Sequence, residues 1–171
     1  MTGAPEPEPR EAAGVRLGEL LAPERVACNL HAASKKRALE LVSELLASSA
    51  PSLSQTAVFE SLIGRERLGS TGLGHGVAIP HARMRGTPHA VAAFVKLDQA
   101  VDYDATDELP VDLLFALLVP EHYTNEHLAL LALVARMFSD PELRRRLREA
   151  ASSQRAYELL TRWPQEHPAG T

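Results

Sequence analysis

The stretch GRERLGSTGLGHGVAIPHAR, residues 64–83, is the most informative part of this sequence. Within it we expect the end of a helix, then a glycine-rich turn and then a strand. Residues 76–80 form a short apolar run, and we interpret it as a strand that stops at Pro80, since proline donates no hydrogen bond to a sheet. His81 is therefore predicted at a strand end, where α/β proteins place their functional sites. The alternative is a histidine in an ordinary surface loop.

The residue types in this stretch suit phosphoryl chemistry. A neutral imidazole is nucleophilic near pH 7, and a guanidinium presents a fork of donors that matches phosphate oxygens. His81 is thus the candidate acceptor and Arg65 its candidate partner, with a solvated surface arginine as the alternative for Arg65. The glycines lack the Gly-Lys-Ser/Thr ending of a P-loop, so we interpret them as turn residues that let the backbone approach an anion.

A second histidine, His127, is predicted in the first turn of a helix that begins after Thr124. It shares a helix face with the apolar residues Leu131, Val134 and Phe138, so the ring is expected to point inward. Burial and the nearby helix N-terminus both disfavour the charged imidazolium and keep the ring neutral. The alternative is a core histidine with a purely structural role.

Composition narrows the class of protein. A chain of 171 residues with a net charge of −4 is long enough for one domain with a real core and gives no electrostatic reason to bind nucleic acid. Cys28 is the only cysteine, which fits a reducing compartment, and no apolar run is long enough to insert in a membrane. We predict a cytoplasmic protein. The histidine spacings match no metal-ligand pattern, so neither a metal nor a cofactor is predicted.

The chain is predicted to hold one α/β domain between two tails. Residues 1–14 are acidic and proline-rich and are expected to be disordered, and residues 164–171 are expected to be loose. Between them, residues 15–163 alternate between helical and strand-like patterns. Four helices are predicted to follow the N-caps Ser34, Ser54, Thr124 and Asp140, and a fifth helix is predicted at residues 153–162. Gly64 is predicted to end the second helix. Buried strands are predicted at residues 90–97 and 111–119.

Several of these residues resemble a known family. Arg65 and Glu66, the Gly-Ser-Thr run at 69–71 and GVAIPH at 76–81 are similar to the IIA domain of the fructose–mannitol class of the bacterial phosphotransferase system. LGELLAPERV at 17–26 and SKKRAL at 34–39 point to its nitrogen-regulatory branch. The resemblance covers roughly residues 15–163. It implies a single domain with a mixed, about five-stranded sheet flanked by helices on both faces.

The resemblance also implies roles for the candidate residues. His81 is expected to accept a phosphoryl group on Nε2 from HPr or its nitrogen-branch relative. His127 is expected beside it as a supporting histidine, and Arg65 is expected to stabilise the phosphoryl group. Retention of these three residues argues against the further alternative, a non-catalytic binding module with the same fold.

Two functions within the family remain open at this point. One is a regulatory protein of the nitrogen branch, whose phosphorylation state controls partners such as kinases or transporters. The other is a sugar-specific IIA component that passes its phosphoryl group to a IIB domain during fructose- or mannitol-type uptake. The nitrogen-branch opening and the lack of a IIB or membrane IIC segment in this sequence favour the regulator.

Overall fold

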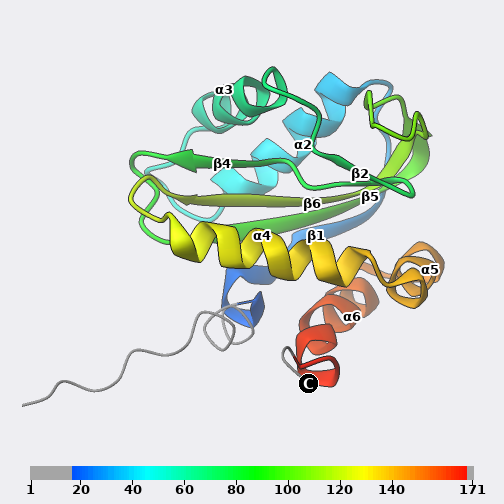
Figure 1. The fold of residues 1–171 in the computed structure, drawn as a ribbon. Coiled ribbons are helices and arrows are strands. Elements are labelled where there is room, and N and C mark those ends of the chain that lie inside the picture. The colour runs from blue at the N-terminus through cyan, green and yellow to red at the C-terminus, as the bar shows by residue number, and fades with distance from the viewer. Residues whose placement is uncertain (1–16, 169–171) are drawn as a thin grey trace, which may run out of the picture.

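A mixed β-sheet lies between two layers of helices in the computed structural model, which describes residues 17–168 (Figure 1). Helices α2 and α3 cover one face of the sheet, and α4, α5 and α6 lie on the other. This confirms the predicted α/β domain with helices on both faces. In chain order the elements are β1 (Leu21–Leu30), α2 (Lys35–Ala47), α3 (Gln55–Glu66), β2 (Gly72–Gly74), β3 (Val77–Ala78), β4 (His81–Met84), β5 (Val91–Val101), β6 (Val111–Pro120), α4 (Asn125–Phe138), α5 (Pro141–Glu149) and α6 (Ser153–Glu166).

The strand order is β1-β5-β6-β3-β2, and β4 also pairs with β6. The β1/β5 pair and the pairs that β3 and β4 make with β6 are parallel, whereas β5/β6 and β2/β3 are antiparallel. The sheet is therefore mixed, as expected. Its six strands occupy five positions, because β3 and β4 lie in line beside β6.

β3 and β4 are two halves of one strand. Val77 pairs with Leu113 and His81 with Leu117, so the register along β6 is the same before and after the break. The carbonyl of Pro80 still accepts from the Leu117 amide at 3.0 Å. β3 ends at Ala78, so the predicted interruption at Pro80 and the position of His81 at a strand end are confirmed, but the sequence analysis did not predict that β4 begins at His81 in the same register. Proline removes only its own N–H from the ladder, and the extended backbone resumes with His81 as the first residue of β4.

The central strands are buried on both faces. Along β6, Leu113, Phe115 and Leu117 pack towards α4, α5 and α6, and the alternate residues Leu114 and Ala116 pack towards α2 and α3. All five are 0–1% exposed. The continuous apolar runs at 90–97 and 111–119 were predicted to be strands covered on both sides, and the structure confirms this.

Helix α3 delivers two side chains to the site. Its predicted N-cap is confirmed, because Ser54 accepts a hydrogen bond from the Ala57 amide at 3.0 Å. The predicted end at Gly64 is wrong: the helix continues to Glu66, and Gly64 is an ordinary helical residue with open space around it. As a result Arg65 and Glu66 occupy the last helical turn, directly before the glycine-rich segment.

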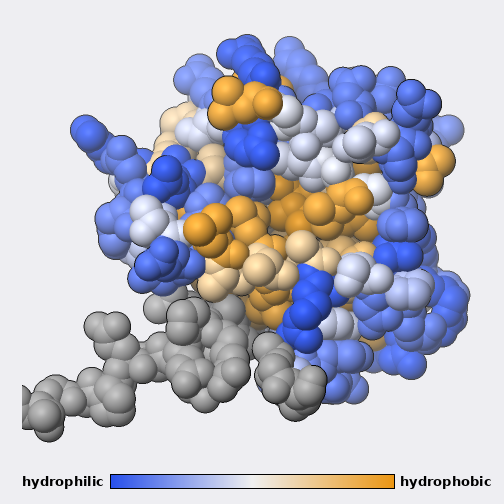
Figure 2. All heavy atoms as spheres, viewed as in Figure 1, coloured by the Kyte–Doolittle hydropathy of each residue, from blue (hydrophilic) through white to orange (hydrophobic). Residues whose placement is uncertain are grey.

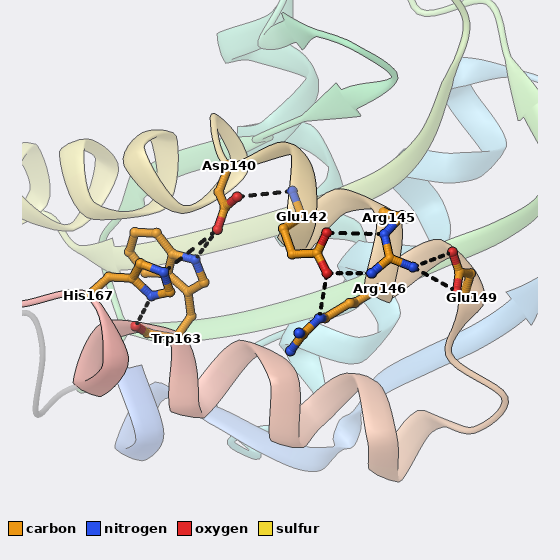
Figure 3. A network of polar contacts seen from close by, with 7 residues as sticks. All are labelled: Asp140, Glu142, Arg145, Arg146, Glu149, Trp163 and His167. Carbon is orange, nitrogen blue, oxygen red and sulfur yellow. Dashed lines mark hydrogen bonds and ion pairs between the residues drawn. The ribbon is translucent and has the colours of Figure 1, made fainter.

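The C-terminal helix runs further than the sequence suggested. α6 extends through the buried Pro164 to Glu166, so the loose tail predicted from residue 164 does not include 164–166. Figure 3 shows what anchors this end: the Asp140 carboxylate caps α5 through the Glu142 amide at 2.9 Å and accepts from Trp163 Nε1 at 2.8 Å. His167 stacks on Trp163 with ring centroids 4.2 Å apart. The predicted tail at 1–14 and residues 169–171 lie outside the described residues.

Close packing at Gly72, where β2 pairs with β3, generates a stability prediction. A Cβ on Gly72 would lie 2.7 Å from the Cβ of Ala105, and a Cβ on Gly64 would meet nothing within 4 Å. We expect Gly72→Ala to lower the free energy of unfolding by about 1–3 kcal/mol through overpacking. The matched control Gly64→Ala should be neutral or raise it by about 0.5–1 kcal/mol, because alanine favours the helix.

Urea denaturation measures both variants, and adding Ala105→Gly to Gly72→Ala should recover part of the loss. Equal unfolding midpoints for Gly72→Ala and Gly64→Ala would contradict the close approach.

Candidate functional site

His81 is fixed by a hydrogen bond to the strand interruption itself. Its Nδ1 lies 2.7 Å from the carbonyl oxygen of Ile79, and because a carbonyl only accepts, Nδ1 carries the proton. The lone pair of the neutral ring is thus on Nε2. Partial burial lowers the pKa of His81 below its usual 6.5; the Ile79 bond opposes this shift and the charge of Arg65 adds to it. The ring is neutral and nucleophilic at pH 7.

His127 lies against His81, as the resemblance implied. The two ring centroids are 5.5 Å apart and the rings meet edge to face at 76°. His127 is 8% exposed, and its Nε2 is buried without a hydrogen-bond partner among the described residues. Burial, followed by the charges of His81 and Arg83, lowers its pKa to about 4. A buried polar atom without a partner costs free energy, so this nitrogen indicates a place prepared for an oxygen-bearing ligand.

Arg65 lies within electrostatic reach of His81 at the end of α3. Its guanidinium Nη1 donates to the carbonyl of Gly69 at 2.8 Å, which holds the start of the glycine-rich segment against the helix. Gly69 is its only hydrogen-bond acceptor within residues 17–168, so most of the guanidinium fork is left for a ligand. Its charge also acts on His81, which it makes harder to protonate. The structure therefore brings Arg65, His81 and His127 to one place.

The sequence analysis missed a second cation at this site. Arg83 is two residues after His81 in β4, and side chains two apart in a strand share a face. The positive charge of Arg83 reaches His127 and lowers the pKa of that ring. Its signal in the sequence was the spacing of two from His81, which has meaning only once the strand is known to continue past Pro80.

Large apolar side chains are exposed near residues of the site in the sequence. Leu68, just after α3, is 85% exposed, and Leu128, next to His127, is 66% exposed. Figure 2 shows hydrophobic residues gathered on the face that carries α4, with hydrophilic residues around them. Contiguous exposed apolar surface of this kind is typical of a protein-binding face.

Two further properties bear on the chemistry. No helix in residues 17–168 combines the length and apolar character needed to cross a membrane. Within the same residues, no three His, Cys, Asp or Glu side chains are grouped as ligands for a metal ion.

Comparison with known proteins shows the family of this chain. The family model described as "Phosphoenolpyruvate-dependent sugar phosphotransferase system, EIIA 2" matches residues 19–163. The chain belongs to this family. The enzyme IIA for mannitol from Escherichia coli, which shares the fold with a TM-score of 0.64 at 20% identity, has been solved in a complex with phosphorylated enzyme IIB.

Similar proteins carry a regulatory name. The nitrogen regulatory protein of Pseudomonas aeruginosa is 45% identical over 146 residues, which are 85% of this chain and 95% of that protein. The nitrogen regulatory protein of Escherichia coli K12 is 46% identical over 148 residues, 86% of this chain and 90% of that protein. The crystal structure of nitrogen regulatory protein IIA-Ntr from Neisseria meningitidis superimposes with a TM-score of 0.80 at 42% identity, covering 84% of this chain and 98% of that one.

The pKa of His127 predicts a pH dependence of stability. The ordinary pKa of 6.5 applies to the unfolded chain and a value of about 4 to the folded one, so unfolding takes up a proton between these pH values. Stability is therefore fully present above about pH 6.5 and falls as the pH drops towards about 4. His127→Gln should flatten this dependence.

Denaturant unfolding at pH 7 and at pH 4.5 tests this for the wild type and the variant. His89→Gln, which removes a histidine from an exposed position, is the matched control. An identical pH dependence in the wild type and His127→Gln would show that the fold does not hold His127 neutral.

Proposed function

We propose that this chain is a phosphoryl-accepting regulatory protein of the nitrogen-branch phosphotransferase system and acts in the cytoplasm. In this proposal His81 takes a phosphoryl group on Nε2 from phosphorylated HPr or its nitrogen-branch relative. The observation that carries the proposal is the pairing of a free Nε2 on His81 with the buried, unpartnered Nε2 of His127, 5.5 Å away between ring centroids. The regulatory names of the relatives at 45–46% identity support it over a sugar-specific carrier.

The mechanism follows from the protonation states. The Nε2 lone pair of His81 forms the new N–P bond, and the electron pair of the broken P–N bond returns to the donor's nitrogen. Arg65 offsets charge on the equatorial phosphoryl oxygens. His127 supplies a ring nitrogen to the phosphoryl group, because the dianion favours its protonated, donating form.

The site also suits a switch in protein binding. Phosphorylation of His81 would add close to two negative charges to a protein whose surface also exposes the apolar residues Leu68, just after α3, and Leu128, the residue after His127. A regulatory target, such as a kinase or a transporter, that docks over His81 would meet a different surface in each state. A IIB domain is the corresponding partner in the alternative function, sugar transport, and neither function needs a membrane segment or nucleic acid.

Acceptance of phosphate at His81 is the first test. Incubation with phosphoenolpyruvate, enzyme I and HPr should add one phosphoryl group that acid removes and base does not. His81→Ala should abolish this, and the matched control His89→Ala should not. Intact-mass spectrometry with peptide mapping measures the result, and unreduced incorporation in His81→Ala would exclude His81 as the acceptor.

The regulatory role predicts a partner that distinguishes the two states. We expect at least one cytosolic protein to bind one phosphorylation state about tenfold more tightly, which is roughly 1.4 kcal/mol. Titration of each partner recovered from the native cytosol against phosphorylated protein and His81→Ala measures this. Equal affinities for both states, together with rapid loss of phosphate to a IIB domain, would favour the sugar carrier instead.

A further inference from the structure

A buried carboxylate lies next to Arg65, and the proposed mechanism does not use it. The Glu66 side chain is only 3% exposed, although it ends a helix, where a negative charge is unfavourable. Its oxygens accept hydrogen bonds from the amide and hydroxyl of Thr71 and from the hydroxyl of Tyr103 at 3.2 Å. Lys35 Nζ, at the start of α2, pairs with it at 3.0 Å. So many partners indicate that the charge itself is retained for a purpose.

The same contacts lead from Glu66 to His81. The Thr71 amide donates to Glu66 at 3.1 Å, and the Thr71 carbonyl accepts from the Ile79 amide at 3.0 Å. The Ile79 carbonyl in turn accepts from His81 Nδ1 at 2.7 Å. Three hydrogen bonds, linked through the backbones of Thr71 and Ile79, thus connect the buried carboxylate to the ring nitrogen that sets the tautomer of His81.

The transfer step gives this negative charge a role. When the Nε2 lone pair of His81 bonds to phosphorus and the donor's nitrogen recovers its own electron pair, the proton on Nδ1 stays in place. The ring of His81 therefore becomes an imidazolium with one positive charge. A carboxylate in the low-dielectric interior stabilises such a charge far more than one in water. The charged and titratable groups of the site are Arg65 and Glu66 from α3, Arg83 from β4 and His127 from α4. Glu66, which also pairs with Lys35, is the anion among these groups.

We infer that Glu66, held by Lys35 and Tyr103, is a positioning residue for phosphoryl transfer. It fixes His81 through Thr71 and Ile79 and supplies the negative charge that balances the imidazolium formed during transfer. This inference rests on the proposed phosphoryl transfer to His81 and adds the counter-charge that the transfer requires.

Glu66→Gln tests the role of the charge with little change in shape. In single-turnover transfer from phosphorylated HPr, we expect the rate within the docked complex to fall about tenfold. The docking constant, obtained from the dependence of the rate on carrier concentration, should change less than about twofold, since Glu66 is buried. Glu60→Gln, the same change at an exposed position of α3, is the matched control and should leave both quantities unchanged.

A double variant that removes both charges of the Lys35–Glu66 ion pair separates an effect on phosphoryl transfer from an effect on folding. Lys35→Met leaves Glu66 buried without its ion-pair partner and should lower the urea midpoint. Lys35→Met combined with Glu66→Gln removes both charges, so it should recover the midpoint but not the transfer rate. This double variant also carries the test if Glu66→Gln alone fails to fold.

Two results would overturn the inference: a wild-type transfer rate in Glu66→Gln, or recovery of both midpoint and rate in the double variant. Failure of the wild type to accept phosphate at His81 would instead overturn the proposed function. The two failures are distinguishable because only the second involves the unaltered chain.

Discussion

The site depends on the interruption of one strand at Pro80. β6 holds the segments on both sides in one register, so the chain stays extended although proline breaks the ladder. The Ile79 carbonyl accepts a hydrogen bond from Nδ1 of His81, and the Pro80 carbonyl accepts one from the Leu117 amide of β6. A flexible loop would leave the ring of His81 free to rotate. Here the sheet determines both the position of the ring and which nitrogen carries the proton.

The electrostatics of the site follow from this placement. Two imidazoles lie edge to face between the cations Arg65 and Arg83, and burial keeps both rings neutral at pH 7. In the resting site the charges of Arg65 and Glu66 act on His81, and the charge of Arg83 acts on His127. In the proposed transfer, the cations would stabilise the phosphoryl oxygens, and Glu66 would stabilise the positive charge that develops on the ring of His81.

The sequence predicted the features that depend on residues close together in the chain better than those that depend on distant residues. Ser34 and Ser54 were recognisable as N-caps because each bonds to an amide three residues ahead, and the runs at 90–97 and 111–119 were recognisable by their apolar character alone. β1 was not predicted as a strand, since its burial does not alternate and its partner β5 is far along the chain. The continuation of the strand past Pro80 was missed for the same reason: β6 imposes it. His81, His127 and Arg65 were candidates from their residue types and positions, and spacing alone left surface or core alternatives open for each. Their roles in phosphoryl transfer were implied only by the family resemblance and stay a prediction.

Glu66 shows why an apparently ordinary residue can escape sequence analysis. A glutamate beside arginines at a helix end has the pattern of a solvated surface, and its partners Lys35 and Tyr103 lie more than 30 residues away in opposite directions along the chain. Its burial becomes visible only when α2, α3 and the end of β5 meet. Burying a carboxylate costs several kcal/mol unless it is fully paired, so a fold that needed only stability would be served as well by apolar side chains at these positions. The retained set of charges makes sense where a transient positive charge must be balanced, and the proposed transfer would form such a charge on His81, which is linked to Glu66 through the backbone of Thr71 and Ile79.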